Sequence, residues 1–288
     1  IPLVEFGLPP ALIQKSDSAS LYLTRDIAAL RYRLQRFRPK KILYVVGNEQ
    51  SLHFEQLFAI AKILKLTGAE LVHVKYGLVL GEGGKKLATR EGRTAPAEET
   101  LAKAVKLAKS VVSKKNPELG EKEKDAVAGA VGVGALKYND LKEGRTSDIV
   151  FDWKKMLDLT GDSAPYIQYT HARLRSIAAK AGASAARAKK SGRAGVGLLN
   201  EEAELDLMRK ILEFPYEAER SGKILQTSTL ASYLYKLSVL ANRFYETVPV
   251  LKEENARRRA ALLLLIAATA GVLKKGLALL GIVAQERI

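Results

Sequence analysis

A glycine-rich and basic stretch, residues 81–93, contains the side chains whose types and spacing best suit chemistry. It reads GEGGKKLATREGR, so glycines precede Lys85 and Lys86, and Arg90 and Arg93 follow. Glycines let backbone N–H groups approach phosphate oxygens, and a lysine adds a mobile positive charge. The same residue types are common in solvated turns. The stretch is therefore either a phosphate-binding loop or a basic surface turn, and composition alone does not decide between them.

Other signatures of cofactor and metal chemistry are missing from the sequence. GAVGVGA at 129–135 has its glycines in the wrong order for a dinucleotide fingerprint, and no apolar strand precedes it, so we interpret it as helix packing or a bend. The chain has no Walker sequence and no cysteine. Three histidines (His53, His73 and His171) argue against a multi-histidine metal site. We therefore expect no metal bound by the protein and no nicotinamide chemistry.

The charge balance points to a polyanionic partner. The formal net charge is +16, and residues 1–160 and 161–288 contribute equally to it, so it is not the property of a basic tail. Such an excess favours nucleic acid as the partner, although a merely soluble basic protein has the same balance. The absence of cysteine fits a reducing compartment, and we expect a cytoplasmic protein.

The elements that would position the basic stretch form a β-α-β unit. KKILYVVGNEQ at 40–50 begins as a continuous apolar run, which predicts a fully buried strand of a parallel sheet. Residues 51–68 have apolar side chains at helical spacing and end at Gly68, a suitable C-terminal cap. Residues 69–80 return as a strand. Ligands bind beyond the carboxyl ends of such strands, so this position favours phosphate binding by the stretch at 81–93.

The segments before and after the β-α-β unit are predicted to be mainly helical. ASLYL at 19–23 reads as a further strand, with a helix from Thr24. A helix is predicted at 97–113, then a charged linker at 114–124, and mostly helices from residue 125 onward, which together resemble an α-helical bundle. The longest apolar run, 260–273, is too short to span a bilayer and predicts a buried helix, so we expect no membrane partner. Because the chain begins IPLVEF without a Met, we expect a piece of a longer protein.

Several motifs occur together in an order that is typical of one family. KLATR at 86–90 resembles the Lys-Met-Ser-Lys-Ser signature loop of class I aminoacyl-tRNA synthetases. Other segments resemble arginyl-tRNA synthetases in the same order along the chain: LYLTRDIAALRYR (21–33), VVGNEQSLHFEQ (45–56), GVGALKYNDLKEGRTSDIVFDW (132–153), SAPYIQYTHARLRSI (163–177), TSTLASYLYKL (227–237) and LKKGLALLGI (273–282). The resemblance covers nearly the whole chain.

The resemblance implies a fold and a domain division. It implies the α/β remainder of a Rossmann-type class I synthetase catalytic domain at 1–155, followed by an all-α helical-bundle anticodon-binding domain at 156–288. The Asp-Ala-Leu-Arg signature that names the family's anticodon-binding domain is not spelled out here. The His-Ile-Gly-His signature and the family's N-terminal domain are also missing, so we expect the C-terminal half of such an enzyme, with the N-terminal half as a partner.

The resemblance also implies an arginine site and an ATP site. The family's contacts to the arginine side chain fall on Tyr22, Asp26 and Gln50, where a carboxylate would pair with the planar guanidinium. The ordinary alternatives are a buried tyrosine, an acid in a helix's first turn and a surface glutamine. The ATP-binding positions are His53, Gly77, Leu78, Val79, Lys86, Thr89 and Arg90, of which Lys86 and Arg90 would be catalytic by stabilising charge on the phosphates. Ala88 replaces the usual serine, so we expect one polar phosphate contact fewer.

For RNA, the resemblance assigns the helical bundle to the arginine tRNA. Single-stranded bases are read by stacking on aromatic rings and by edge contacts, and phosphates are held by lysine and arginine. Arg173, Arg175 and Tyr245 are the candidate contacts, whereas we interpret Tyr166, Tyr169 and Phe244 as core. The acid-free stretch 175–193 either follows phosphates or is a solvated loop.

The predicted function is therefore that of an arginine–tRNA ligase in partial form. It would use ATP, with Mg²⁺, to activate L-arginine as arginyl-adenylate and transfer the arginyl group to the 3′ end of arginine tRNA. The alternative is a non-catalytic tRNA-binding fragment or module.

Overall fold

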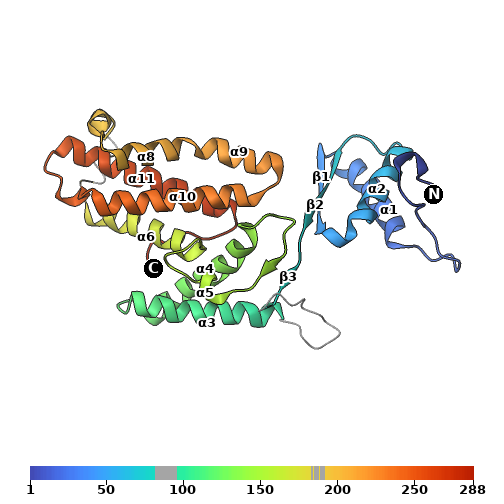
Figure 1. The fold of residues 1–288 in the computed structure, drawn as a ribbon, viewed down its shortest axis with the longest axis horizontal. Coiled ribbons are helices and arrows are strands. Elements are labelled where there is room, and N and C mark those ends of the chain that lie inside the picture. The colour runs from blue at the N-terminus through green and yellow to red at the C-terminus, as the bar shows by residue number, and fades with distance from the viewer. Residues whose placement is uncertain (82–95, 183, 185–187, 189–191) are drawn as a thin grey trace. The chain divides into compact units, whose positions relative to one another are not determined.

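The computed structural model describes residues 1–81, 96–182, 184, 188 and 192–288, and it is mainly helical (Figure 1). Its strands are β1 (Lys41–Gly47), β2 (Glu70–Tyr76), β3 (Val79–Leu80) and β4 (Ile149–Val150). Its α-helices are α1 (Tyr22–Phe37), α2 (Ser51–Ile63), α3 (Ala97–Lys115), α4 (Glu121–Leu141), α5 (Trp153–Met156), α6 (Ala164–Lys180), α8 (Glu202–Leu212), α9 (Phe214–Ile224), α10 (Thr227–Thr247) and α11 (Ala256–Leu279). Short 3₁₀ helices are η1 (Val4–Phe6), η2 (Asn48–Gln50), η5 (Gly192–Leu198) and η6 (Val250–Lys252).

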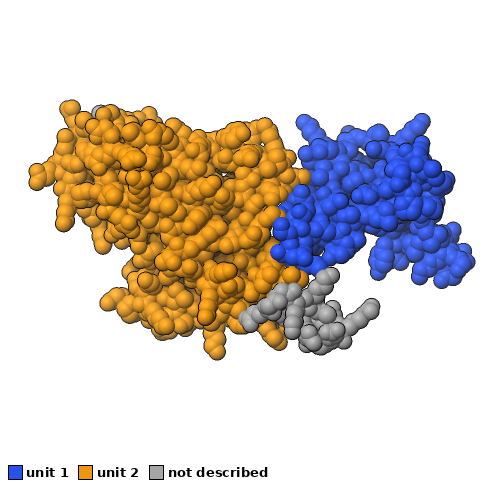
Figure 2. All heavy atoms as spheres, viewed as in Figure 1, with its two compact units in different colours: residues 1–78, 145–148 blue, residues 79–144, 149–288 orange. Residues whose placement is uncertain are grey.

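The described chain divides into two compact units, which are coloured separately in Figure 2. Unit 1 contains residues 1–78 together with 145–148, and unit 2 contains residues 79–144 and 149–288. The chain therefore leaves unit 1 after β2, returns to it for four residues after α4, and leaves it again. These units are defined by how compactly their residues pack. The division at 155/156 that we expect for the two functional domains stays a prediction.

Unit 1 contains the predicted β-α-β unit. β1 and β2 pair in parallel, with Lys41 opposite Glu70 at one end and Gly47 opposite Tyr76 at the other. α2 is the crossover helix between them, and its apolar side chains form a core with one face of the sheet and with α1. That core contains Leu23, Tyr44, Phe54, Leu57 and Ile60.

Two predicted element boundaries in unit 1 are wrong. The segment 19–23 is not a strand, because α1 already begins at Tyr22, and only an isolated bridge between Gln14 and Ser20 precedes it. α2 ends at Ile63, five residues before the predicted glycine cap. The chain turns at Lys65, which has a φ of 52°, and Gly68, with a φ of 115°, lies in the turn that leads into β2.

The prediction that β1 is fully buried is also wrong. Only Tyr44 is buried along this strand, and Leu43 and Val45 are 44% and 64% exposed. Side chains alternate between the faces of a strand, so these two point away from the face that α1 and α2 cover. In the part of the chain that the structure describes, β1 pairs only with β2. Unit 1 by itself therefore leaves part of the apolar surface of β1 exposed.

Unit 2 begins with a long helical pair. The predicted linker at 114–124 is reduced to a turn at 116–120, because α3 continues to Lys115 and α4 begins at Glu121. The glycine-rich segment at 129–135 lies within α4, as the helix-packing interpretation requires. A Cβ atom on Gly132 would lie 2.8 Å from the backbone of Ala104, so the absence of a side chain permits α3 and α4 to pack closely.

The rest of unit 2 is a bundle of α6 and α8–α11, which confirms the predicted helical bundle. Its core is formed largely by leucines of α10 and α11, together with Phe244 and Tyr138. Among the described helices, α11 is the one that is long and apolar enough to cross a membrane by length and composition, and half of that apolar window is buried inside the protein. Burial in this core accounts for the apolar run at 260–273.

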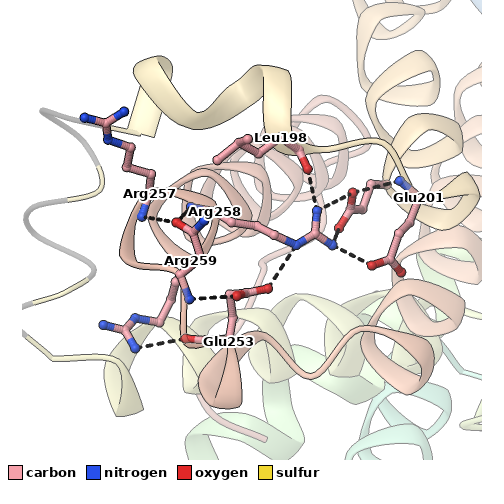
Figure 3. Close-up of polar contacts among 8 residues, drawn as sticks. Leu198, Glu201, Glu253, Arg257, Arg258 and Arg259 are labelled. Carbon is pink, nitrogen blue, oxygen red and sulfur yellow. Dashed lines mark hydrogen bonds and ion pairs between the residues drawn. The ribbon is translucent and has the colours of Figure 1, made fainter.

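A cluster of charged side chains links two connections of this bundle, the one between η5 and α8 and the one between η6 and α11 (Figure 3). Arg258, in the first turn of α11, donates to the carbonyl of Leu198 at the end of η5. Its guanidinium also contacts Glu201 and Glu204 at 2.6 Å and Glu253 at 2.9 Å. The Glu204 side chain is completely buried, so a single arginine neutralises an acid that water cannot reach.

Candidate functional site

The carboxyl edge of the β1–β2 sheet brings together two of the predicted site residues. β1 ends at Gly47, η2 follows, and α2 begins at Ser51, so His53 lies in the first turn of α2. α1 places Asp26 just after its first turn. His53 Nε2 lies 2.7 Å from Asp26 Oδ2, which shows that the N-terminal ends of α1 and α2 meet beside the end of β1. The side chains of His53 and Asp26 are 24% and 37% exposed.

The two other predicted arginine contacts lie on the elements that hold this pair. Tyr22 and Asp26 are four residues apart within α1, so their side chains share one face of the helix. The Tyr22 side chain is 79% exposed, and the guanidinium of Arg25 lies 5.9 Å from its ring centre. Gln50 is exposed at the end of η2, immediately before α2. An ionised carboxylate with one oxygen engaged by His53 still has a second oxygen for a cation.

A segment from much later in the chain, residues 145–148, crosses the end of β2. A Cβ atom on Gly77 would lie 2.2 Å from the carbonyl oxygen of Ser147, so only glycine permits this crossing. Arg145 Nη1 donates to the carbonyl of Lys75 at 2.6 Å, and the Leu78 N–H donates to Asp148 Oδ1 at 2.7 Å. Nothing in the local sequence pattern signals a contact across 70 residues.

The predicted phosphate-binding loop lies outside the described residues. Lys86, Thr89 and Arg90, together with the rest of 82–95, belong to that part of the chain. Its approach is described: β2 ends at Tyr76, and Val79 begins the separate strand β3, which pairs with β4. The predicted strand at 69–80 is therefore two strands, with Gly77 and Leu78 between them.

The candidate RNA contacts in unit 2 centre on Arg173. Its guanidinium lies 4.9 Å from the ring centre of Tyr169 and 4.9 Å from that of Tyr245. Arg173 Nη1 also donates to Asn242 Oδ1 at 2.8 Å, and Asn242 in turn donates to Thr170. The arginine is thus held between two aromatic rings in one orientation, an arrangement that cation–π attraction stabilises.

These residues line a cleft of about 380 Å³, which we call the arginine–tyrosine cleft. The turn after α3 and the last three residues of the chain complete its wall. The lining residues are Lys115, Asn116, Leu119, Tyr169, Ala172, Arg173, Ser176, Ile177, Lys180, Tyr245, Glu286, Arg287 and Ile288. Basic side chains outnumber the single acid, so the cleft favours an anionic or base-bearing ligand.

The structure separates the sequence candidates in this region. Arg173 and Tyr245 are neighbours in the cleft, whereas Arg175 forms an ion pair with Glu286 at its edge. Phe244 is fully buried, and Tyr166 is partly buried against the bundle core, as expected. The interpretation of Tyr169 as a core residue is incomplete, because its ring also lines the cleft. Of the basic stretch 175–193, residues 183, 185–187 and 189–191 lie outside the described residues.

Two family models together match most of the chain. Residues 1–153 match the catalytic domain of "tRNA synthetases class I (R)", and residues 167–288 match the "DALR anticodon binding domain". The chain belongs to the arginyl-tRNA synthetase family. The Asp26–His53 pair lies in the first match and the arginine–tyrosine cleft in the second, except for the cleft residues contributed by α3 and the turn after it.

Individual arginyl-tRNA synthetases are similar to the chain over its full length. An arginine–tRNA ligase from Chloroflexus aurantiacus is 40% identical over 282 residues, which are 98% of this chain and 49% of that protein. One from Streptococcus pneumoniae is 41% identical over 290 residues, covering 100% and 50%. A crystal structure of arginyl-tRNA synthetase from Plasmodium falciparum superposes with a TM-score of 0.79 at 28% identity, covering 96% of this chain and 46% of that one. The chain thus spans about half the length of the curated relatives it matches.

Proposed function

We propose that the chain is one half of an arginine–tRNA ligase, which activates L-arginine with ATP and transfers it to arginine tRNA. The observation that carries the proposal is the Asp26–His53 pair at the carboxyl edge of the sheet, within a chain that belongs to this family. Ligands bind at this edge in open α/β sheets, and a carboxylate there suits a cationic substrate.

In this proposal, Asp26 accepts hydrogen bonds from the guanidinium of arginine while His53 holds the carboxylate in place. Tyr22, on the same face of α1, and Gln50, beside His53, supply further polar contacts. A site built on such hydrogen bonds rejects amino acids that lack the guanidinium, because its polar groups would be left unpaired. The resemblance assigns His53 to the ATP site, and its contact with Asp26 favours a role closer to the amino-acid side of the reaction.

The activation step joins the arginine carboxylate to the α-phosphorus of ATP and releases pyrophosphate. Lys86 and Arg90 would stabilise the charge on the phosphates, with Thr89 as a further contact. Gly77, Leu78 and Val79 would lie beside the adenine. Magnesium enters only as the usual companion of the ATP phosphates. In the described parts of the chain, no three His, Asp or Glu side chains are grouped to hold a metal ion.

For the transfer step, the terminal adenosine of the tRNA attacks the arginyl carbonyl and releases AMP. The arginine–tyrosine cleft would bind bases of the same tRNA, with Tyr245 as a stacking surface and Arg173 as an edge donor. Arg175 would contribute through its position at the cleft edge. A cytoplasmic location, where tRNA is charged, is part of this proposal.

The test is ATP–pyrophosphate exchange in the presence of arginine and tRNA. We expect no exchange from this chain alone and clear exchange when the N-terminal half of the enzyme is fused upstream or added as a second polypeptide. The matched control is the same fusion with Lys86→Ala, which should fold and bind tRNA but lose exchange.

Each result of this test separates the two candidate functions. Robust exchange by the isolated chain would contradict the idea that it is a partial enzyme. A fusion that binds arginine tRNA but never supports exchange would favour the alternative, a non-catalytic tRNA-binding module. That alternative rests on the cleft alone, which lies entirely within unit 2.

A further inference from the structure

The last eight residues of the chain, 281–288, form a tail that side chains hold in place. After α11 ends at Leu279, the tail forms no helix or strand. Three of its backbone carbonyls, at alternate positions, accept hydrogen bonds from side chains of α4 and α6. The bonds are Lys137 Nζ to Gly281 at 2.7 Å, Gln168 Nε2 to Val283 at 2.7 Å, and His171 Nδ1 to Gln285 at 2.8 Å.

The two α6 residues of this set are buried with unused hydrogen-bonding atoms. Gln168 is 0% exposed and His171 is 1% exposed. Gln168 Oε1 and His171 Nε2 are both buried, and neither has a partner among the described residues. Because His171 Nδ1 carries the hydrogen that it donates to a carbonyl, Nε2 of the neutral ring is an acceptor. Leaving these two atoms buried without a partner costs free energy.

The residues after Gln285 form one wall of the arginine–tyrosine cleft. Glu286, Arg287 and Ile288 all line it. The Ile288 side chain is 7% exposed and belongs to a core cluster with residues of α3, α4 and α6. Glu286 is contacted by Arg175 from α6 and by Lys274 from α11. The hydrogen bond from His171 therefore secures the tail immediately before the residues that shape the cleft.

We propose that Gln168 and His171 are positioning residues for RNA binding, which hold the C-terminal tail as a wall of the arginine–tyrosine cleft. This inference rests on the proposed function, because it assumes that the cleft binds tRNA. Neither side chain lines the cleft. They act on it through the backbone of residues 283 and 285, so the loss of either should move Glu286–Ile288 without removing any group that contacts RNA.

The position of His171 also makes the docking of the tail sensitive to acid. Protonation would add a hydrogen to the buried Nε2, which has no acceptor in the described structure. The charged groups around the ring are Arg175 from the same helix, Lys274 from α11 and Glu286 from the tail. Burial is the largest cause that lowers the pKa of His171, with Lys274 and Arg175 adding to it and the bond to Gln285 and the charge of Glu286 opposing it. The charged ring is therefore disfavoured while the tail is docked.

The experiment compares variants by tail mobility and by RNA affinity. His171→Phe removes the donor and keeps the ring volume, while His171→Asn keeps an N–H donor at the Nδ1 position and cannot titrate. Gln168→Met removes the other donor. Gln56→Met is the matched control, because Gln56 also donates its side-chain amide to a backbone carbonyl, that of Pro9, in unit 1. Hydrogen exchange of the amides of residues 284–288 measures the tail, and affinity is measured for arginine tRNA and for a tRNA with an unrelated anticodon.

We expect His171→Phe and Gln168→Met to accelerate exchange in the tail and to weaken binding of arginine tRNA roughly tenfold, as loss of one buried hydrogen bond would. His171→Asn and Gln56→Met should retain both properties. Between about pH 7.5 and about pH 5.5, the wild-type chain should lose affinity relative to His171→Asn, because a proton at position 171 favours the undocked tail and only the wild-type ring can take one up.

Two results would overturn the proposal, and a third would overturn the acid sensitivity of the tail. Unchanged tail exchange in His171→Phe and Gln168→Met would show that these side chains do not hold the tail. Faster exchange with unchanged tRNA affinity would show that the tail is not a functional wall, while the proposed function remains intact. Equal pH dependence in wild type and His171→Asn would remove the role of the ring. Failure of the proposed function has a different signature: the wild-type chain itself would not prefer arginine tRNA.

Discussion

At the scale of residues, the pairing of Asp26 with His53 joins two elements that are separate in sequence. The hydrogen bond occupies one carboxylate oxygen and limits rotation of the Asp26 side chain. A cationic ligand then meets an acceptor that is already oriented, which reduces the entropy lost on binding. The arginine–tyrosine cleft has a similar arrangement, since Asn242 and two rings hold Arg173 in one orientation.

Replacement of Asp26 tests its role directly. In the enzyme completed by an N-terminal half, we expect Asp26→Asn to lower kcat/KM for arginine roughly 10- to 100-fold, because a charged hydrogen bond is lost. Steady-state exchange kinetics measure this effect. Asp17→Asn is the control, since Asp17 is an exposed acid that accepts from the Ala19 N–H in the loop before α1. An equal loss in both variants would argue against a specific pairing with arginine.

Two histidines, the partly buried His73 and the buried His171, make stability depend on pH below neutrality. Burial lowers the pKa values of His73 and His171 below that of an ordinary histidine. As the pH falls through about 6.5, the unfolded chain takes up protons before the folded chain does, so the stability present above this pH is progressively lost. We expect His171→Asn to reduce the loss of unfolding free energy between about pH 7.5 and about pH 5.5. Urea denaturation followed by the fluorescence of Trp153, the single tryptophan, which lies in unit 2, measures the effect. If His171→Asn loses as much unfolding free energy between the two pH values as the wild type does, His171 is not a source of the pH dependence.

At the scale of elements, single side chains join segments that the chain order keeps apart. Arg258 connects the ends of η5 and η6 to the starts of α8 and α11 (Figure 3). Tyr138 on α4 donates to Asp162, in the loop before α6, at 2.6 Å, and its hydroxyl also lies 3.1 Å from the carbonyl of Ala231 on α10. Burial and the nearby acid both raise the pKa of Tyr138, so its hydroxyl keeps its proton.

Loss of the Arg258 guanidinium should destabilise unit 2 strongly. In Arg258→Met, Glu204 stays buried without its cation, which costs about 3–5 kcal/mol when one partner of a buried pair is removed. Urea denaturation gives the change in unfolding free energy. The double variant Glu204→Gln/Arg258→Met should recover part of the loss because no buried charge remains. A double variant as unstable as the single one would show that packing of the arginine, and not its charge, is what matters.

The sequence predicts an element well when the pattern of its residues depends on that element alone. The β-α-β unit, α3 and the helical bundle follow from periodicity and glycine punctuation, and Gly132 follows from the same reasoning about helix packing. Contacts that bring distant segments together are not visible in periodicity. Ser147 crossing Gly77 and Ile288 closing the cleft depend on how the whole unit folds, and no local pattern encodes them. An apolar run does not say which partner covers it, and for this reason the prediction of a buried β1 fails at Leu43 and Val45.

At the scale of the whole molecule, the positive charge is distributed over both halves of the chain. Neither the Asp26–His53 edge nor the arginine–tyrosine cleft accounts for a net charge of +16. Phosphate contacts along a long RNA would use basic residues far from either site, and binding would then be electrostatic to a large extent.

Salt should therefore weaken tRNA binding by this chain. Between about 50 mM and about 200 mM salt we expect affinity for arginine tRNA to fall at least about tenfold, which two phosphate contacts would already produce. Filter binding or fluorescence anisotropy over a salt series measures the slope. Preference over a tRNA with an unrelated anticodon should persist at both concentrations, because base contacts release few ions. A flat salt series, or equal affinity for both tRNAs, would contradict the proposed mode of binding.

The return of residues 145–148 to unit 1 sets the order in which this chain becomes complete on the ribosome. β1, α2 and β2 emerge early, but the segment that covers Gly77 is made only after the whole of α3 and α4. Domains generally fold as units while synthesis proceeds. During that interval the open end of β2 is without Arg145 and Asp148, so unit 1 stays incomplete until the two long helices of the other unit have been made.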